Sequence, residues 1–288
     1  MRVVTIASDI EQPFLNKLLI PSCHTAGLAL TVLHADRNDF DPADKRAILT
    51  DYLRKSIAPD DLFLFTDAYD TVLVRGEEFI RERYASFSQG IVFSAEPNSY
   101  PLGPLGLALH DAPPERPYPY LNSGGFIATA GQFLDLCAKY PTPPSDQFPL
   151  LRRLREHGYD IDQRFGFSDQ YHWTLVQHLE PRMVRLDHKA AIFESFAPVL
   201  PDVRDAAVRA EWRDFRLRGK EADGYHRERA RLVPRLRQPS GAAQLHFSSP
   251  ITKAVTLDLF DEAALPSWLQ AALGSRQTHY PDVEVRRV

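Results

Sequence analysis

Asp67 and Asp70 are the residues of this chain whose spacing points most directly to chemistry. They follow the apolar run 62–65 (LFLF), which is typical of a buried strand in a parallel sheet. In open α/β sheets, ligands bind just beyond the carboxyl ends of such strands. Two carboxylates there can converge on one hard divalent cation, and that cation can hold a diphosphate. The alternative is that Asp67 caps a turn and Asp70 begins the next element.

The segment Asn122-Ser123-Gly124-Gly125 is the second candidate binding element. Paired glycines after an asparagine and a small hydroxyl residue predict a turn without an obstructing Cβ, so a ligand can approach the backbone closely. The amide of Asn122 can both donate and accept hydrogen bonds, as recognition of a sugar hydroxyl requires. A plain tight turn without a ligand is the alternative.

Three further side chains could serve the same site. Asp169 lies at the start of an expected helix, where it would either face a reacting group or cap the helix. His246 follows an apolar residue and could be the third ligand of a manganese-like ion beside two carboxylates, the alternative being a structural histidine. Lys45 could meet phosphate or be solvated at the surface.

Strands and helices alternate along the first half of the chain. The hydrophobic pattern predicts strands at 2–7, 28–33, 61–66 and 90–95, and helices at 14–25, 43–56 and 77–85. This alternation predicts an α/β fold with a parallel sheet and right-handed crossovers. Further helices are expected near 132–138, 148–157 and 170–178, and a short strand at 244–247.

Composition and charge restrict the class of protein. Hydrophobic residues make up 44% of the 288 positions and charged residues 25%, as in ordinary soluble globular proteins. The net charge of −4 argues against nucleic acid as the main partner. Cys23 and Cys137 belong to no metal-spaced cluster, so buried thiols in a reducing compartment are expected. The apolar run 1–7 is too short for a signal peptide and no stretch approaches a membrane span, so we expect a cytoplasmic protein.

Residues 202–238 differ in character from the rest of the chain. They include eleven Lys or Arg and seven Asp or Glu, a local charge of +4. We expect a helical excursion with solvated faces, and a basic face for an anionic acceptor or partner is the alternative.

Three sequence blocks carry a resemblance to a known family: residues 65–73 (FTDAYDTVL), 92–96 (VFSAE) and 120–127 (YLNSGGFI). Taken in this order, with Asp169-Gln170 and His246, they resemble the glycosyltransferase domain of the multifunctional procollagen lysyl hydroxylases and its stand-alone relatives. The resemblance implies a GT-A-type, Rossmann-like fold with a mostly parallel central sheet flanked by helices. It also implies a UDP-sugar donor and Mn²⁺, with Mg²⁺ as the alternative ion.

The resemblance implies a role for each candidate residue. Asp67, Asp70 and His246 would bind the metal, and Tyr69 would lie beside the nucleotide. The residues around the uridine diphosphate and along the donor would be Thr5, Ala7, Lys45, Ser123, Gly124 and Gly125. Those facing the sugar or the acceptor would be Glu96, Asn122 and Asp169. The GT-A-like domain is expected over residues 1–255, including the charged excursion, and a C-terminal helical tail over 256–288.

The expected reaction is transfer of glucose or galactose from UDP-glucose or UDP-galactose to a hydroxyl of a glycan, a peptide or a small molecule. If the reaction inverts the anomeric centre, a carboxylate must take the acceptor proton, with Asp169 the first candidate and Glu96 the second. If it retains configuration, these residues position the sugar. A catalytically weak nucleotide-sugar-binding module is the alternative, because the family's acidic run before the glutamine is reduced here to Ser168-Asp169.

Overall fold

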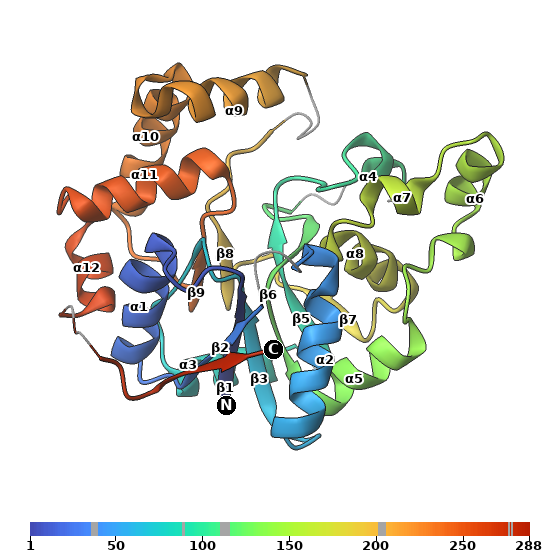
Figure 1. Cartoon of the computed structure of the whole chain (residues 1–288), viewed down its shortest axis with the longest axis horizontal. Coiled ribbons are helices and arrows are strands. Elements are labelled where there is room, and N and C mark those ends of the chain that lie inside the picture. The colour runs from blue at the N-terminus through green and yellow to red at the C-terminus, as the bar shows by residue number, and fades with distance from the viewer. Residues whose placement is uncertain (36–39, 88–89, 110–115, 201–205, 276, 278) are drawn as a thin grey trace.

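The computed structural model describes residues 1–35, 40–87, 90–109, 116–200, 206–275, 277 and 279–288. The strands of its central sheet are β1 (Arg2–Ala7), β2 (Leu30–His34), β3 (Leu62–Thr66), β5 (Ile91–Glu96), β6 (Tyr120–Thr129), β7 (Val184–Leu186) and β10 (Val283–Arg287). They are arranged in the order β10-β2-β1-β3-β6-β5-β7 (Figure 1).

Most neighbouring strands of this sheet are parallel. The pairs β10–β2, β2–β1, β1–β3 and β5–β7 run parallel, whereas β6 is antiparallel to both β3 and β5. The prediction of an α/β fold with a mostly parallel central sheet flanked by helices is confirmed. β6 differs from the expected parallel arrangement, because it lies between β3 and β5 and runs antiparallel to both.

A second, smaller sheet stands beside the first. It consists of β4 (Thr71–Leu73), β9 (Gln244–His246) and β8 (Phe193–Ser195), in the order β4-β9-β8. β4 begins a few residues after the end of β3 and pairs antiparallel with β9, so Thr71 lies opposite His246. This pairing brings a residue from the last fifth of the chain to the end of β3.

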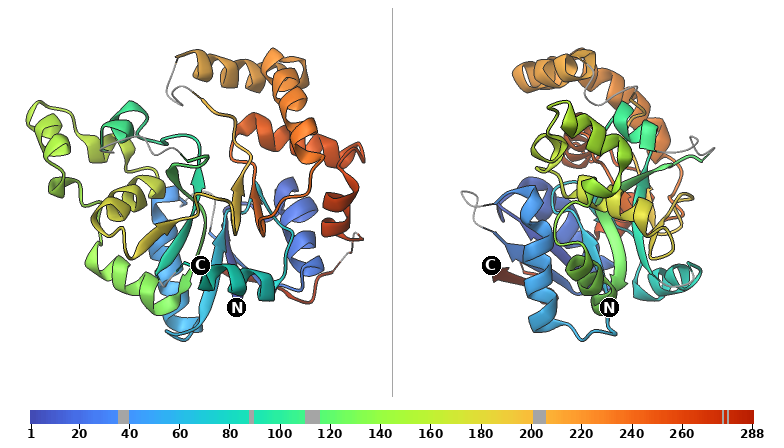
Figure 2. Two further views of the ribbon diagram at one scale, coloured as in Figure 1. Left: turned by 180° about the vertical axis from the view of Figure 1, so that it is seen from behind. Right: turned by 90° about the vertical axis from the view of Figure 1, so that its right-hand side faces the viewer.

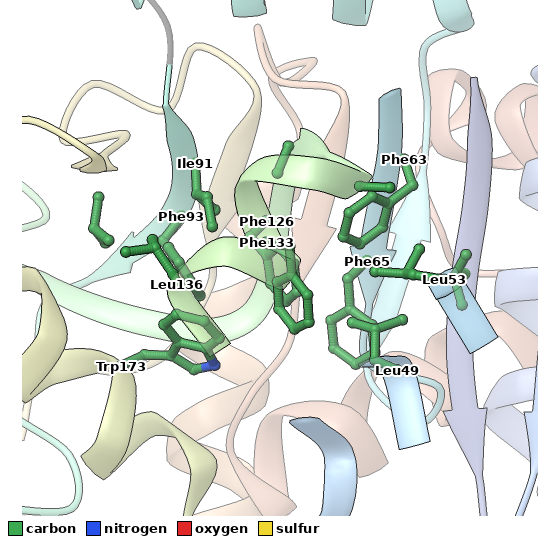
Figure 3. Close-up of a cluster of buried hydrophobic side chains, with 14 of the residues drawn as sticks. Leu49, Leu53, Phe63, Phe65, Ile91, Phe93, Phe126, Phe133, Leu136 and Trp173 are labelled. Carbon is green, nitrogen blue, oxygen red and sulfur yellow. The ribbon is translucent and has the colours of Figure 1, made fainter. Parts of the chain in front are cut away.

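Helices cover both faces of the central sheet because side chains alternate along each strand. In β3, Phe63 and Phe65 join one apolar cluster, and Leu64 between them joins another. The first cluster is closed by α2 (Lys45–Ser56), α5 (Ala130–Lys139) and α8 (Asp169–Leu179). Figure 3 shows this cluster, in which the rings of Phe126 and Phe133 stack with centroids 5.5 Å apart.

The opposite face of the central sheet is covered by a π-helical turn (Leu15–Leu19) that continues into α1 (Ile20–Thr25), and by α3 (Glu77–Ala85). Two further helical groups flank the sheet, as Figure 2 shows from behind. One contains α9 (Ala206–Arg218), α10 (Asp223–Leu236), α11 (Pro250–Asp261) and α12 (Ser267–Leu273), and the other α4 (Pro104–Leu109), α6 (Pro149–Glu156) and α7 (Ile161–Phe165). In the described part of the chain, no helix combines the length and the apolar character needed to span a membrane.

Two expectations from the sequence are corrected by the structure. Asn122, Ser123, Gly124 and Gly125 do not form a turn but lie within the ten-residue strand β6, at a register shift opposite Phe93 and Ser94. The expected helical tail contains β10, which forms a parallel pair with β2. Residue 255, at the expected domain boundary, lies in α11, and the division into domains stays a prediction.

The charged excursion is helical where the structure describes it. It forms the pair α9 and α10, and residues 202–205 at its start lie outside the described residues. α10 packs on α11 through apolar residues such as Leu232 and Val255. A separate apolar cluster therefore joins the α9–α10 pair to the rest of the protein.

Candidate active site

Asp67, Asp70 and His246 offer ligand atoms that all lie within 4.8 Å of one another. Asp67 follows the last residue of β3, and Asp70 precedes the first residue of β4. His246 ends β9, and the N–H of Phe247 donates to the carbonyl of Asp70 at 2.7 Å. The small sheet therefore brings together three potential metal ligands from two distant parts of the sequence.

The turn that carries the two aspartates is fixed by hydrogen bonds to its backbone. The hydroxyl of Thr71 donates to the carbonyl of Asp67 at 2.5 Å, and the hydroxyls of Thr66 and Thr71 lie 2.6 Å apart. The N–H of Asp67 donates to the carbonyl of Gly124 at 2.9 Å. These contacts hold both carboxylates at the carboxyl edge of the sheet.

The donor set fits a divalent cation. Asp70 Oδ1 and both ring nitrogens of His246 are buried and have no hydrogen-bond partner among the described residues. Asp70 Oδ1 and His246 Nε2 are 3.3 Å apart, so an ion could replace a direct contact between them. Two carboxylates and an imidazole suit Mn²⁺, and the carboxylates suit Mg²⁺ as well. Buried polar atoms without partners are costly unless a ligand satisfies them.

Neighbouring charges control the ionisation of this group. Burial by itself would raise the pKa of Asp70, but His246, Lys253 and Lys45 together lower that pKa below its usual range. Burial lowers the pKa of His246, yet Asp70 and the other nearby carboxylates raise it above the ordinary value. Lys253 Nζ lies 3.7 Å from Asp70 Oδ2. The carboxylate that a cation needs is thus kept ionised.

Because Gly124 has no side chain, there is space for Asp67, Asp70 and His246 to lie close together. A Cβ at this position would lie 2.3 Å from His246 Cε1 and 2.9 Å from Asp67 Oδ2. At Gly125, a Cβ would lie 2.5 Å from the side-chain nitrogen of Gln244. The glycine pair therefore serves close packing within a strand, where the sequence pattern indicated a turn.

Glu96 and Asn122 form a buried polar network with Gln170. Glu96 Oε1 accepts hydrogen bonds from the amides of Asn122, at 3.0 Å, and Gln170, at 2.8 Å. The side-chain oxygen Oδ1 of Asn122 accepts from the backbone N–H of Gly124 at 2.8 Å. Burial raises the pKa of Glu96, and the two amide hydrogen bonds oppose that shift. The network holds Asn122 and Glu96 in fixed orientations beside the aspartates.

Asp169 and Lys45 meet on the other side of Asp67. Lys45 Nζ donates to Asp67 Oδ1 at 2.6 Å and lies 4.0 Å from Asp169 Oδ1. Asp169 does not cap its helix but accepts a hydrogen bond from the hydroxyl of Ser123 at 3.1 Å. Burial raises the pKa of Asp169, although Lys45 acts in the opposite direction. Lys45 is thus paired with two carboxylates rather than solvated.

A cavity of about 280 Å³ opens at this edge of the sheet. Among the expected residues, its walls include Asp67, Asp70, Glu96, Asn122, Gly124 and His246. The other expected residues, all within the described chain, lie outside its lining: Thr5, Ala7, Lys45, Tyr69, Ser123, Gly125 and Asp169.

The residues expected near the nucleotide belong to β1 and to the aspartate turn. Thr5 and Ala7 are fully buried in β1, and Thr5 Oγ1 has no hydrogen-bond partner among the described residues. The hydroxyl of Tyr69 accepts a hydrogen bond from the N–H of Asp9 at 2.6 Å. This contact ties the aspartate turn to the segment that follows β1.

Three residues that contribute to the site were given no role from the sequence. Gln170 bridges β6 and Glu96, and the Asp-Gln pair at the start of α8 was the available signal. Lys253 neutralises Asp70 from α11, and Trp212 lines the cavity from α9. Lys253 and Trp212 could not be recognised from local sequence patterns, because their positions at the site depend on how the C-terminal helices pack against the sheets.

Part of this chain matches a known domain family and a set of curated relatives. A sequence model described as the PLOD GT domain matches residues 1–148. Procollagen-lysine,2-oxoglutarate 5-dioxygenase 1 of Mus musculus is 28% identical over 164 residues, covering 55% of this chain and 19% of the relative. The Gallus gallus protein of the same name is 27% identical over 194 residues, covering 61% of this chain and 22% of the relative. The chain therefore spans about a fifth of the length of these relatives.

Among solved structures, the apo crystal structure of mouse xyloside xylosyltransferase 1 aligns with a TM-score of 0.41 and 13% sequence identity. The alignment covers 86% of this chain and 97% of that protein.

Proposed function

Because the chain belongs to the PLOD GT domain family, a family of glycosyltransferase domains, we propose that it transfers glucose or galactose from a UDP-sugar to a hydroxyl-bearing acceptor. We propose further that the reaction depends on a divalent metal ion, Mn²⁺ or alternatively Mg²⁺. The proposed acceptor is a glycan, a peptide or a small molecule that carries a hydroxyl.

The observation that carries this proposal is the group formed by Asp67, Asp70 and His246 in the wall of the cavity. Buried ligand atoms without partners at the carboxyl edge of a mostly parallel sheet are the expected setting for a metal that holds a diphosphate. When bound there, the ion would offset the negative charge that develops on the departing UDP.

The remaining residues would bind and orient the substrates. Lys45, held between two carboxylates, would contribute positive charge beside the diphosphate, and Tyr69, Thr5 and Ala7 would form the nucleotide side. Because Gly124 has no side chain, the UDP-sugar could approach the proposed metal ligands closely. This arrangement would place the sugar towards Glu96 and Asn122.

Two carboxylates are available for the acceptor proton if the reaction inverts the anomeric centre. Asp169 is our first candidate, and its raised pKa would suit a base. Glu96 is the second candidate and has the advantage of lining the cavity. If configuration is retained, both would position the sugar instead.

A screen of UDP-sugars with and without Mn²⁺ tests the proposal. Thermal shift and UDP release are measured for the wild type and for D70N, with D60N as a control because Asp60 is an exposed aspartate away from the site. We expect UDP-glucose or UDP-galactose to stabilise the wild type and D60N only when Mn²⁺ is present, and to be hydrolysed slowly. Binding without any turnover would favour the alternative of a nucleotide-sugar-binding module, and no metal-dependent binding would contradict the proposal altogether.

A further inference from the structure

Trp212 lies in a wall shared by two cavities. It belongs to α9, is half-buried, and packs against the apolar cluster of α10 to α12. It lines the cavity that contains the aspartates and also a second cavity of about 190 Å³. The two cavities have Pro198, Leu200, Trp212 and Ser249 in common. They therefore adjoin, and Trp212 stands where one leads into the other.

The first cavity has two chemically different sides. Its carboxylate, amide and imidazole groups come from the aspartate turn, β5 and the residues just after it, β6, α8 and β9. Its apolar wall comes from the segment after β8, with Ala197, Pro198 and Leu200, and from Trp212. Figure 1 shows α9 and α10 at the same end of the molecule as α4 and α7, beyond the ends of the strands. A ligand in this cavity would meet hydrogen-bonding groups on one side and an aromatic face on the other.

A pyranose ring has the matching chemistry. Its hydroxyl edge would face the polar side, and its C–H face would lie on the electron-rich face of an indole. The indole N–H of Trp212 has no acceptor in the described part of the chain, so it could also donate to a sugar hydroxyl.

The charges of the second cavity are balanced. Arg227 pairs with Glu211 at 2.8 Å, and Arg231 pairs with Glu228 at 2.6 Å. All four line the second cavity, so its two positive charges are matched by two negative ones. The net positive charge of residues 202–238 therefore does not make the second cavity an anion site. An uncharged part of a ligand that extends from the first cavity would suit it.

We propose that Trp212 is the platform on which a neutral glycoside acceptor stacks, with the reacting hydroxyl towards the aspartates and the aglycone or next sugar in the second cavity. The pair α9 and α10 then selects the acceptor, whereas the aspartate side binds the donor. This inference rests on the proposed function and adds the acceptor class to it.

Steady-state transfer from the active UDP-sugar tests the inference. The acceptors are p-nitrophenyl glycosides of glucose, galactose and xylose, a p-nitrophenyl glucuronide, and a peptide containing hydroxylysine. The proteins are wild type, W212A, W212F and the control W268A, whose tryptophan packs in the same apolar cluster but lines neither cavity. Melting temperatures are measured for all four.

For the wild type we expect a neutral glycoside to be the best acceptor. W212A should raise the KM for that glycoside by about 10-fold or more while kcat changes less, because an aromatic platform contributes mainly to binding. W212F should recover most of the loss, and W268A should keep the wild-type KM. If W212A is unfolded, the comparison of W212F with wild type and with W212L replaces it.

Three results would overturn the inference. They are an unchanged glycoside KM in folded W212A, a glucuronide or hydroxylysine peptide preferred to every neutral glycoside, and an equal rise in KM in W268A. A wild type that neither binds UDP with Mn²⁺ nor releases UDP from any UDP-sugar overturns the proposed function itself, and the inference falls with it. Donor hydrolysis in the wild type without acceptor thus distinguishes the two failures.

Discussion

A Cβ placed on Gly124 would lie 2.3 Å from Cε1 of His246. The same atom would lie 3.0 Å from the side-chain oxygen of Asn122, which accepts the N–H of Gly124 itself. The glycine therefore lies between the proposed metal ligands and the proposed sugar-facing amide. Any side chain here must displace one of the two.

We expect Gly124→Ala to weaken Mn²⁺-dependent UDP binding by about 10-fold or more, because His246 can no longer keep its position beside Asp70. The melting temperature should fall only modestly, since the clash is with side chains at the cavity and not with the sheet. Gly241→Ala is the matched control, because a Cβ there meets nothing within 4 Å. A titration in which both variants bind like wild type would remove Gly124 from the site.

Removal of one carboxylate should abolish metal-dependent binding of UDP. We expect Asp70→Asn to retain the fold and to lose at least about 100-fold in Mn²⁺ affinity, because a carboxylate is a far better ligand for a hard cation than an amide. His246→Ala should weaken Mn²⁺ binding by only about 10-fold, because two carboxylates remain. Isothermal titration with Mn²⁺ and UDP measures both. Equal affinities in wild type and Asp70→Asn would contradict the metal assignment.

Local patterns predicted the elements that fold by local rules. The alternation of apolar runs and amphipathic stretches indicated β1, β2, β3 and β5 with the helices between them, because strand and helix periods differ. The acidic turn after β3 was found from its place at a strand end. The glycine pair was misread, because a Gly-Gly signal favours a turn locally, whereas β6 is held in a strand by partners on both sides.

Long-range pairing was outside the reach of such patterns. The proximity of His246 to Asp70 depends on the ladder between β4 and β9, which joins segments separated by more than half of the chain. The sequence offered His246 only as a possible third ligand, and the family resemblance gave it that role. The same holds for β10, since an edge strand with Arg286 and Arg287 carries too little apolar pattern to be recognised without its partner β2.

The acid–base role can be assigned by comparing Asp169→Asn with Glu96→Gln. We expect Asp169→Asn to lower sugar transfer by on the order of 10²-fold, the usual size of a positioned acid–base group, with UDP and Mn²⁺ affinity nearly unchanged. Asparagine can still accept the hydroxyl of Ser123, so a purely structural role would cost little. UDP release with donor and acceptor is the measurement. If Glu96→Gln shows the large loss instead, the base is the carboxylate that lines the cavity.

His172, one turn beyond Asp169 on α8, should make the protein sensitive to acid. It is 1% exposed, and burial together with the charge of Arg46 lowers its pKa from 6.5 to about 2. Arg46 Nη1 lies 3.0 Å from His172 Nε2 and donates to it when the ring is neutral.

The sign of the effect follows from proton binding. Below pH 6.5 the unfolded chain binds a proton at His172 and the folded protein does not, so acid favours unfolding until the folded pKa is reached. Each pH unit in this window should cost about 1.4 kcal/mol of unfolding free energy, hence about 2 kcal/mol between pH 6.5 and pH 5.

Urea unfolding of wild type and His172→Gln at pH 7.5 and pH 5.0 tests this prediction. Glutamine can accept from Arg46 but does not titrate, so the variant should lose less stability between the two pH values than wild type, by about 2 kcal/mol. Other groups titrate equally in both proteins, and the difference isolates His172. His157→Gln, at an exposed histidine, is the matched control and should follow the wild type. Identical losses in wild type and His172→Gln would show that the buried imidazole does not couple folding to pH.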